Sequence, residues 1–266
     1  MSDVNAFLLE SASTMARELY PFKEVVCAAV IGSVAVGEAD ELSDLEVVCL
    51  CTELHDRLKF TIQDRLGERF NVVGARALTS PIPRVGIYFR HGGFKMSLKL
   101  SRLEEYQDFM LRNHREFLDE DWLRNLARSR ILFDKDGKIS ELKLLVARYP
   151  KDRAREIVKQ GLGSLGYAID LLRKAAARRD RLAFFMALRE GIASAVRVLY
   201  AVNGVYLSRS FKRAILDIRG FKLKPVACED RLRFLVEEGN TPELMMRKID
   251  VLEGLREGLL AYDPKR

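Results

Sequence analysis

Two carboxylates lie two residues apart in Asp44-Leu45-Glu46, at the start of an apolar run that continues to Cys51. Successive side chains of a β-strand point to opposite faces, so both carboxylates are expected on one face. Two like charges beside a sheet are costly unless a cation neutralises them. Hard oxygen ligands of this kind favour Mg²⁺, which commonly carries the phosphates of a substrate. The pair therefore predicts a magnesium site with Asp44 and Glu46 as ligands.

A glycine and a serine, Gly32 and Ser33, follow the apolar run 25–31, which predicts a buried strand. Glycine lets the backbone approach a phosphate closely, and serine supplies a hydroxyl and an N–H. We expect residues 34–38 to begin a short helix whose N-terminus points at that anion. Taken alone, an acidic pair is usually solvated surface and a Gly-Ser step is usually a turn. In combination they predict adjoining phosphate and metal sites.

The order Gly-Ser, the ten-residue spacer 34–43 and then Asp-x-Glu resembles the signature of the nucleotidyltransferase superfamily. The resemblance implies a nucleoside triphosphate, with ATP favoured, whose terminal phosphates lie at Gly32 and Ser33 while Asp44 and Glu46 hold Mg²⁺. The implied reaction is in-line attack of an acceptor hydroxyl on the α-phosphorus, with pyrophosphate leaving. The acceptor stays open among a small molecule, a protein and an RNA end.

Superfamily enzymes resemble one another in using a third carboxylate on a later central strand, and here the chain departs from their pattern. The segment 94–101 alternates, and Lys95, Ser97 and Lys99 share its polar face. This alignment puts Ser97 where an aspartate is expected. Serine is a poor general base and a poor bridge between metal and nucleophile.

Two accounts of this departure remain open. In the first, one Mg²⁺ suffices, Lys95 or Lys99 neutralises developing charge, and Glu104 or Glu105 acts as the base. In the second, the chain is a catalytically weak nucleotide-binding or regulatory protein, similar to the antitoxin-like members of the superfamily. Loss of a general base costs about 10² to 10⁴ in rate, which weakens catalysis more than binding.

The chain also resembles, distantly, the antibiotic nucleotidyltransferases and their relatives, which carry a helical domain behind the catalytic one. Residues 131–137 are similar to the strand and turn that close their catalytic domain. Residues 199–206, followed by Phe211-Lys212, resemble the helical segment that faces the nucleotide. This likeness implies that Lys212 contacts phosphates and that Tyr206 lies near the base or sugar. The alternative is that Tyr206 packs in the helical domain and Lys212 is solvated.

The hydrophobic pattern predicts an α/β plus α architecture. Residues 1–149 are expected to form a nucleotidyltransferase-like domain, a mixed sheet with flanking helices, and residues 150–266 a helical bundle domain. The expected strands are 25–31, 45–51, a hairpin over 84–101 that turns at His91-Gly92-Gly93, and 131–133. The expected helices are 3–19, 53–66, 103–111, 121–127, 151–177, 182–202, 229–237 and 242–260. His91 is interpreted as a turn residue, with a role beside the site left open.

The net charge of +7 suits an anionic partner without choosing among a nucleotide, a nucleic acid and an acidic surface. The basic cluster 173–181 is interpreted as a solvated helix end, so a nucleic-acid partner is left open and not established. Four cysteines lack metal-ligand or disulfide spacing and predict buried reduced thiols: Cys27, Cys49, Cys51 and Cys228. Neither a secretory signal nor a membrane-length apolar run is found, which predicts a cytoplasmic protein without a membrane partner.

Overall fold

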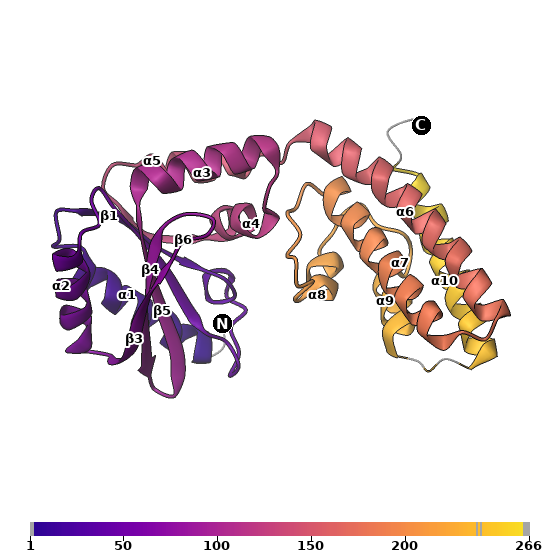
Figure 1. Ribbon diagram of the computed structural model, residues 1–266, viewed down its shortest axis with the longest axis horizontal. Coiled ribbons are helices and arrows are strands. Elements are labelled where there is room, and N and C mark those ends of the chain that lie inside the picture. The colour runs from indigo at the N-terminus through magenta and orange to yellow at the C-terminus, as the bar shows by residue number, and fades with distance from the viewer. Residues whose placement is uncertain (1–2, 238, 240, 263–266) are drawn as a thin grey trace. The chain divides into compact units, whose positions relative to one another are not determined.

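The computed structural model describes residues 3–237, 239 and 241–262, and the chain forms two compact units, Met1–Ala147 and Arg148–Arg266 (Figure 1). The first unit combines a β-sheet with helices, and the second consists of helices. The α/β plus α class predicted from the sequence is therefore confirmed. No helix within the described ranges has the length and apolar composition that a membrane span needs.

The first unit alternates helices and strands along the chain. In order they are α1 (Asp3–Leu19), β1 (Val25–Ile31), the 3-10 turn η1 (Val34–Val36), β2 (Leu45–Cys51), α2 (Asp56–Gly67), β3 (Asn71–Leu78), β4 (Arg84–His91), β5 (Phe94–Arg102), α3 (Leu103–Glu116), α4 (Glu120–Arg128), β6 (Arg130–Asp134) and α5 (Lys138–Val146).

The six strands form one mixed sheet in the order β3-β4-β5-β2-β1-β6. β2 and β5 are parallel neighbours, and every other pair is antiparallel. The predicted hairpin is confirmed, since β4 and β5 pair from Arg84 with Ser101 to His91 with Phe94. Gly92 and Gly93 turn it with positive φ angles. The parallel β2–β5 pair sets the site, because it aligns two strands that are distant in sequence.

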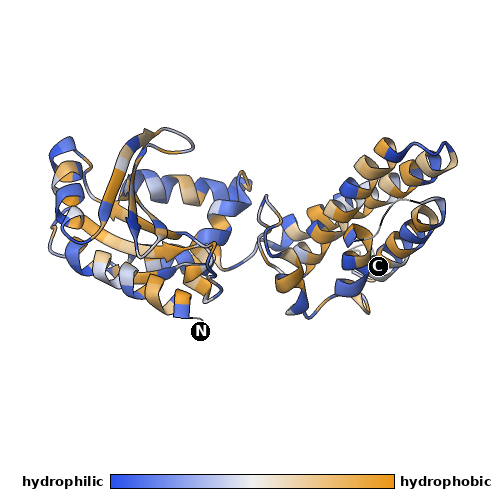
Figure 2. Cartoon of the chain, turned by 90° about the horizontal axis from the view of Figure 1, so that it is seen from below, coloured by the Kyte–Doolittle hydropathy of each residue, from blue (hydrophilic) through white to orange (hydrophobic). Residues whose placement is uncertain are grey.

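One face of the sheet is apolar and packs on α1 and α2. Its buried side chains include Val47 of β2, Ile87 of β4 and Leu98 of β5, together with Met15 of α1 and Ile62 of α2. Figure 2 shows the strands dominated by hydrophobic residues. β1 is buried along its whole length, which explains why it reads as a continuous apolar run, whereas the first half of β2 alternates between buried and partly exposed positions.

The opposite face of the sheet is partly covered by the helices that follow β5. Trp122 of α4 reaches this face, where the Arg84 guanidinium lies 4.8 Å from the centre of its ring. Tyr106 and Phe109 of α3 also contact Trp122. The covered part adjoins the carboxyl end of β5, from which α3 departs, and the rest of this face carries the polar residues of the site.

Three elements of the structure were not predicted: β3, α5 and α8 (Ala214–Arg219). β3 is a half-exposed edge strand with Gly74 in its middle, so its sequence lacks the alternation of an amphipathic strand. The helix expected over 53–66 begins later, at Asp56. His55 is its N-cap, and the Nδ1 atom of this residue accepts a hydrogen bond from the Leu58 N–H over 3.1 Å.

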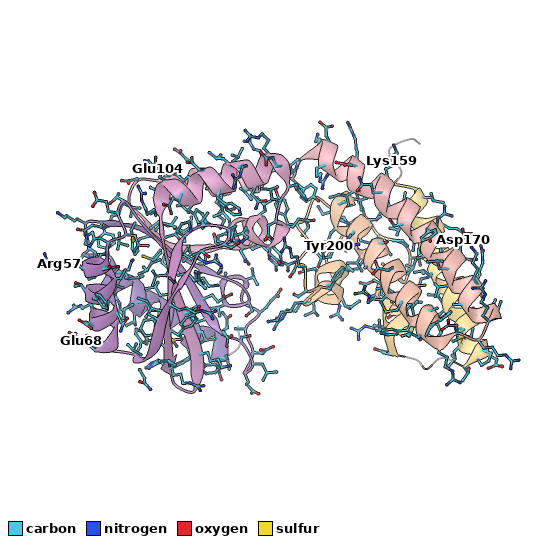
Figure 3. All side chains as sticks on the ribbon, viewed as in Figure 1. Arg57, Glu68, Glu104, Lys159, Asp170 and Tyr200 are labelled. Carbon is cyan, nitrogen blue, oxygen red and sulfur yellow. The ribbon has the colours of Figure 1, made fainter. Side chains whose placement is uncertain are left out.

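The second unit consists of α6 (Lys151–Ala177), α7 (Arg181–Val202), α8, α9 (Cys228–Glu237) and α10 (Pro242–Leu260). α6, α7 and α10 share a single apolar core to which Leu165, Leu199 and Leu252 contribute fully buried side chains. Tyr200 lies within this core (Figure 3), and its hydroxyl donates a hydrogen bond to Asp217 Oδ2 over 2.6 Å. All four cysteines of the chain are free and buried, as predicted.

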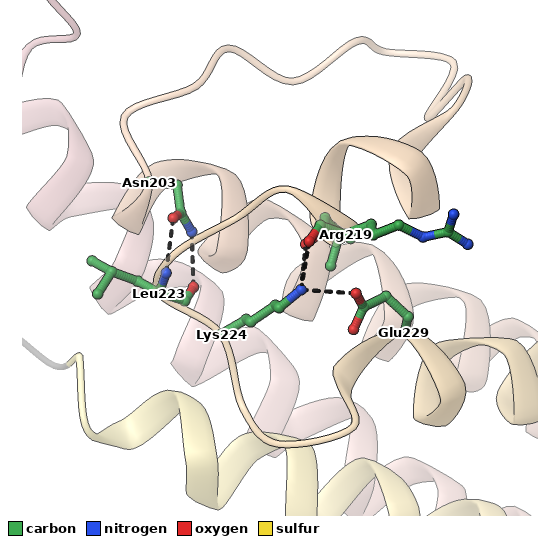
Figure 4. A network of polar contacts seen from close by, with 6 residues as sticks. Asn203, Arg219, Leu223, Lys224 and Glu229 are labelled. Atoms are coloured by element: carbon green, nitrogen blue, oxygen red, sulfur yellow. Dashed lines mark hydrogen bonds and ion pairs between the residues drawn. The ribbon is translucent and has the colours of Figure 1, made fainter.

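A polar network holds the segment that connects α7 with α9 (Figure 4). The Asn203 side chain donates to the Leu223 carbonyl over 2.8 Å and accepts from the Leu223 N–H over 3.0 Å. Lys224 Nζ donates to the carbonyls of Ile218 and Arg219, which end α8, and to Glu229 Oε1 at the start of α9. These bonds satisfy helix-end carbonyls that would otherwise lack partners.

Candidate functional site

The glycine of the predicted phosphate corner lies against one of the two predicted metal ligands. β1 and β2 are antiparallel neighbours in which Ile31 pairs with Glu46, so Gly32 follows directly beside that carboxylate. Gly32 has a φ of +76°, and a Cβ added to it would lie 3.5 Å from Glu46 Oε2. Glycine adopts this conformation without the strain that other residues incur. The corner therefore combines a bare backbone with a carboxylate oxygen.

Ser33 is tied to the residue that precedes Asp44. Its Oγ donates a hydrogen bond to Ser43 Oγ over 3.2 Å, and Ser43 Oγ donates in turn to Asp40 Oδ1 over 2.8 Å. Ser43 is only 4% exposed, so this chain of hydroxyls is sheltered from water. The structure therefore brings Ser33 near the start of the acidic pair through a side-chain contact.

The expected helix over 34–38 is a single 3-10 turn, η1, which ends at Gly37 with a φ of +79°. A turn of this length aligns few peptide dipoles and offers little attraction to an anion. The loop is instead fixed from outside, because the Ala39 N–H donates to Asn5 Oδ1 of α1 over 3.2 Å. Any attraction for phosphate at this corner must come from backbone N–H groups and nearby cations.

The parallel register between β2 and β5 gathers the remaining predicted residues on one face. Glu46 pairs with Ser97, and Val48 pairs with Lys99. Asp44 lies two residues before Glu46, and Lys95 lies two residues before Ser97. Because side chains of a strand return to the same face every second residue, Asp44 and Lys95 share this face. Asp44 is exposed, whereas the Glu46 side chain is 36% exposed.

A cavity of about 400 Å³ opens on this face of the sheet. Two carboxylates, four cationic side chains, a tyrosine and a serine account for most of its lining: Asp44, Glu46, Arg76, Leu78, Arg84, Tyr88, Lys95, Met96, Ser97 and Lys99. Gly32 and Ser33 lie outside this lining, and Gly32 meets it at Glu46. Because cations outnumber carboxylates, the cavity suits an anion that brings its own divalent cation.

The two sides of the β2–β5 pair are joined by an ion pair inside this cavity. Lys99 Nζ donates a hydrogen bond to Glu46 Oε1, and the Lys99 side chain is 25% exposed. The second carboxylate oxygen, Oε2, is the one that faces Gly32. The predicted metal ligand Glu46 therefore already has one of its oxygens bound to a cation from the protein.

Arg84 is a partly desolvated cation of the cavity wall. Burial lowers the pKa of its guanidinium, while the charges of Tyr88 and Glu46 act in the opposite direction. Its Nη2 donates to the Ser80 carbonyl over 3.2 Å, whereas its buried Nε has no hydrogen-bond partner among the described residues. A buried N–H donor without a partner is costly.

Tyr88 forms the floor of the cavity together with Arg76. Arg76 Nε donates to the Tyr88 hydroxyl over 2.9 Å, and the guanidinium lies 5.4 Å from the ring centre. A Cβ at Gly86 would come within 2.8 Å of the same hydroxyl, so the phenol lies over a position that only glycine leaves open. This arrangement fixes an aromatic ring and a cation opposite Ser97.

The sequence missed Arg76, Arg84 and Tyr88 as cavity residues. For β4 a signal existed, because Arg84 and Tyr88 lie in phase with each other and out of phase with the apolar Ile87. For Arg76 no such signal existed, since it lies on the unpredicted edge strand β3.

The alternative base that the sequence suggested is wrong. Glu104 and Glu105 begin α3, beyond Arg102, which pairs with Cys51 at the opposite end of β2 from Asp44. Six residue steps of strand separate those ends, about 20 Å. Both glutamates instead pair with Arg102, and Glu104 lies at the surface with a side chain 78% exposed (Figure 3). Within the described part of the chain, no three acidic, histidine or cysteine side chains form a metal-binding group.

His91 lies away from the cavity. Its ring stacks on Phe7 at 5.4 Å and meets the edge of Phe70 at 5.2 Å, on the apolar face of the sheet. In the second unit, Tyr206 is 4% exposed and its ring packs on Tyr149 at 4.8 Å, while Lys212 is exposed. His91 and Tyr206 thus both pack against aromatic rings within their own units.

Comparison with known proteins gives one family match and several structural likenesses. The family model described as a domain of unknown function, DUF4037, matches residues 116–210, which run from the end of α3 into the loop after α7. This range contains none of the residues that line the cavity. None of the curated proteins matches the chain.

Among solved structures, the chain is similar to a nucleotidyltransferase-like protein from Exiguobacterium sibiricum 255-15, with 12% identity over 97% of this chain and 77% of that one, at a TM-score of 0.45. It is also similar to a cytoplasmic RNA terminal U-transferase, with 16% identity over 48% of this chain and 40% of that one, at a TM-score of 0.30. The chain is similar as well to the non-canonical poly(A) polymerase complex GLD-2–GLD-3, with 17% identity over 48% of this chain and 44% of that one, at a TM-score of 0.29. This chain thus spans less than half the length of both polymerase chains, and none of these three proteins is an antibiotic-modifying enzyme by name.

Proposed function

We propose that the chain is a nucleotidyltransferase, which moves a nucleoside monophosphate from a Mg²⁺-bound nucleoside triphosphate to a hydroxyl acceptor. The observation that carries the proposal is the meeting of Gly32 with Glu46 Oε2 beside Asp44, at the rim of a cavity with cationic walls. A bare backbone, two carboxylates and several cations are what a metal-bound polyphosphate requires. ATP is the favoured donor, and the acceptor is a small molecule, a protein or an RNA.

The donor set fits one Mg²⁺ ion. Asp44 is exposed, and Glu46 keeps Oε2 apart from its contact with Lys99, so each residue offers at least one hard oxygen. When bound, the ion neutralises phosphate charge and polarises the phosphoryl group. Both ligands lie on one face of β2 at consecutive same-face positions, which is the spacing that a shared ion needs.

The protein's own cations are proposed to bind the phosphates. Lys95 and Lys99 extend from β5 on either side of Ser97, and Arg84 lines the same cavity. A guanidinium can hold two phosphate oxygens at once, while an ammonium acts as a point charge. Ser33, held near Asp44 through Ser43, is proposed to contribute its backbone N–H.

A second candidate is nucleotide binding without transfer, as in a regulatory or antitoxin-like protein. Ser97 favours it, because this serine pairs with Glu46 in the register where a third carboxylate would stand, and Glu104 and Glu105 are too far away to replace it. Phosphate and metal binding need only the groups already in the cavity, whereas proton removal from an acceptor needs a base.

The test is incubation with labelled ATP, GTP, CTP or UTP and Mg²⁺, with aminoglycosides, proteins and tRNA as acceptors. Pyrophosphate release and label transfer by the wild type, lost in Asp44→Ala, support the enzyme. Magnesium-dependent nucleotide binding with equal background release from both proteins supports the second candidate. Absence of nucleotide binding to the wild type contradicts both.

A further inference from the structure

The Lys99–Glu46 contact follows from the strand register. Glu46 stands opposite Ser97, and Lys99 lies two residues further along β5 on the same face. The ammonium therefore reaches back past Ser97 to meet Glu46 Oε1. An ammonium that contacts a carboxylate in a partly shielded cavity neutralises about one unit of charge, as a bound cation does.

The neighbours of Lys99 leave room for this reach. Ser97 has a much smaller side chain than the two lysines that flank it on the polar face of β5, so the space beside the Glu46 carboxylate is open. On the other side Lys99 pairs with Gly86, which has no side chain, and the Tyr88 phenol covers that position. The Lys99 side chain therefore has space on the side of Ser97 and the Tyr88 ring on the side of Gly86, and it extends toward Glu46.

The carboxylate oxygens of the acidic pair leave a place for one divalent ion. Asp44 and Glu46 carry two negative charges, and Lys99 removes one of them by direct contact. Glu46 Oε1 is occupied by Lys99, so Oε2 and the Asp44 carboxylate are the oxygens left for metal. No third metal-ligating side chain joins this pair within the described residues. A second divalent ion would find no further carboxylate among these residues and would lie against the ammonium.

We infer that the Lys99 ammonium takes the place of a second divalent cation at this site, so that the site binds one metal ion and Lys99 weakens the affinity for it by competing for Glu46. The inference rests on the proposed nucleotide site and adds to it the number of metal ions and the residue that sets their affinity. Lys99 acts through Glu46 and is a positioning residue in this role.

A purely structural role for Lys99 gives an effect of the opposite sign. If Lys99 only orients the Glu46 carboxylate, its removal loosens a ligand and weakens metal binding. If Lys99 competes with the metal, its removal frees Oε1 and strengthens metal binding. The direction of the change in affinity therefore separates the two roles.

The experiment is Mn²⁺ titration of the full chain, with free Mn²⁺ followed by electron paramagnetic resonance, for wild type, Lys99→Met and Lys95→Met. Mn²⁺ favours the same oxygen ligands as Mg²⁺. We expect one ion per chain in the wild type and binding about tenfold tighter in Lys99→Met. Lys95→Met removes the same charge from the same cavity, and its affinity should rise less than about threefold because exposed charges are screened.

Unchanged or weaker Mn²⁺ binding in Lys99→Met overturns the inference, as does binding of two ions by the wild type. Lys99→Gln, a shorter neutral variant, gives the same reading if Lys99→Met fails to show the thermal unfolding transition of the wild type. Binding by Lys99→Met alone supports the role of Lys99 and contradicts the proposed function of the wild type. Binding by neither protein overturns the inference, and nucleotide binding in the presence of Mg²⁺ then tests the proposed function separately.

Discussion

Ser97 of β5 pairs with Glu46 of β2 in the parallel register, with Lys99 two residues further along bound to the same glutamate. The side chain next to the candidate metal ligand is therefore a hydroxyl instead of a carboxylate. The cavity therefore has groups that can bind a metal-bound phosphate, but position 97 supplies no carboxylate to act as a general base.

Ser97→Asp is expected to strengthen catalysis. An aspartate opposite Glu46 supplies both an extra metal ligand and a base, and a positioned base contributes at least about a hundredfold in rate. Pyrophosphate release from ATP, measured with and without acceptor, reports the change. The control is Ser97→Asn, whose side chain has the shape of aspartate but carries no charge. Its rate of pyrophosphate release should stay at the wild-type value. Equal rates for Asp and Asn at this position would mean that the missing carboxylate is not what limits turnover.

Gly32→Ala is expected to weaken nucleotide binding about tenfold, because the new methyl group would meet Glu46 Oε2 in the space proposed for the ligand. The matched control is Gly37→Ala, which shares the positive φ but has nothing within 4 Å of its added Cβ. Both variants should lose about 1–2 kcal/mol of stability from backbone strain. ATP titration should therefore distinguish them although thermal unfolding does not. Equal nucleotide affinity in the two variants would show that Gly32 has no role beyond its turn.

Lys224→Met is expected to destabilise the helical unit by about 1–3 kcal/mol. The substitution removes the donor that satisfies two carbonyls at the end of α8 and the partner of Glu229. The hydrogen bond from Lys224 is also the main reason that the pKa of Glu229 lies below its usual range. Urea unfolding measures the loss. Lys222→Met, two residues away at an exposed position, should change stability by less than about 0.5 kcal/mol.

Ionisation of the buried Cys228 thiol is expected to lower the free energy of unfolding at alkaline pH. Burial, with a smaller contribution from the charge of Glu229, raises the pKa of this thiol from 9.0 to about 11. A raised pKa for this acid means that its contribution to stability is complete below pH 9.0 and is lost as the pH rises through about 11. Urea unfolding at several pH values should show a fall on the order of 1–2 kcal/mol over this range.

Cys228→Ala should lower the free energy of unfolding at neutral pH and make its decline between pH 9 and 11 shallower, with the remaining decline due to other buried thiols such as Cys27, whose pKa burial also raises. A decline as steep as that of the wild type would assign the alkaline loss to other groups.

The sequence was sufficient for the parts of the fold that local pattern determines. β1 is a continuous apolar run because it is buried on both faces, and β5 alternates because only one of its faces is apolar. The Gly92-Gly93 turn and the long amphipathic helices α6 and α7 follow from equally local signals.

The candidate site depended on information that is not local. The sequence placed Asp44, Glu46 and Ser97 on polar faces, but the contact of Lys99 with Glu46 requires the register of two parallel strands separated by a helix and a hairpin. Arg76 stayed hidden on an edge strand without alternation. The same register excludes Glu104 as the base, because β5 carries the chain to Arg102, which pairs with Cys51 at the opposite end of β2 from Asp44, before α3 begins.

The central claim, a metal-dependent nucleotide site at Asp44 and Glu46, is tested most directly by ATP titration of wild type and Asp44→Asn with and without Mg²⁺. The account predicts that Mg²⁺ strengthens ATP binding to the wild type by at least about tenfold and has little effect on Asp44→Asn, because the amide cannot replace the charge of a metal ligand. ATP affinity that does not depend on Mg²⁺ in the wild type, or that responds to Mg²⁺ equally in the variant, would contradict it.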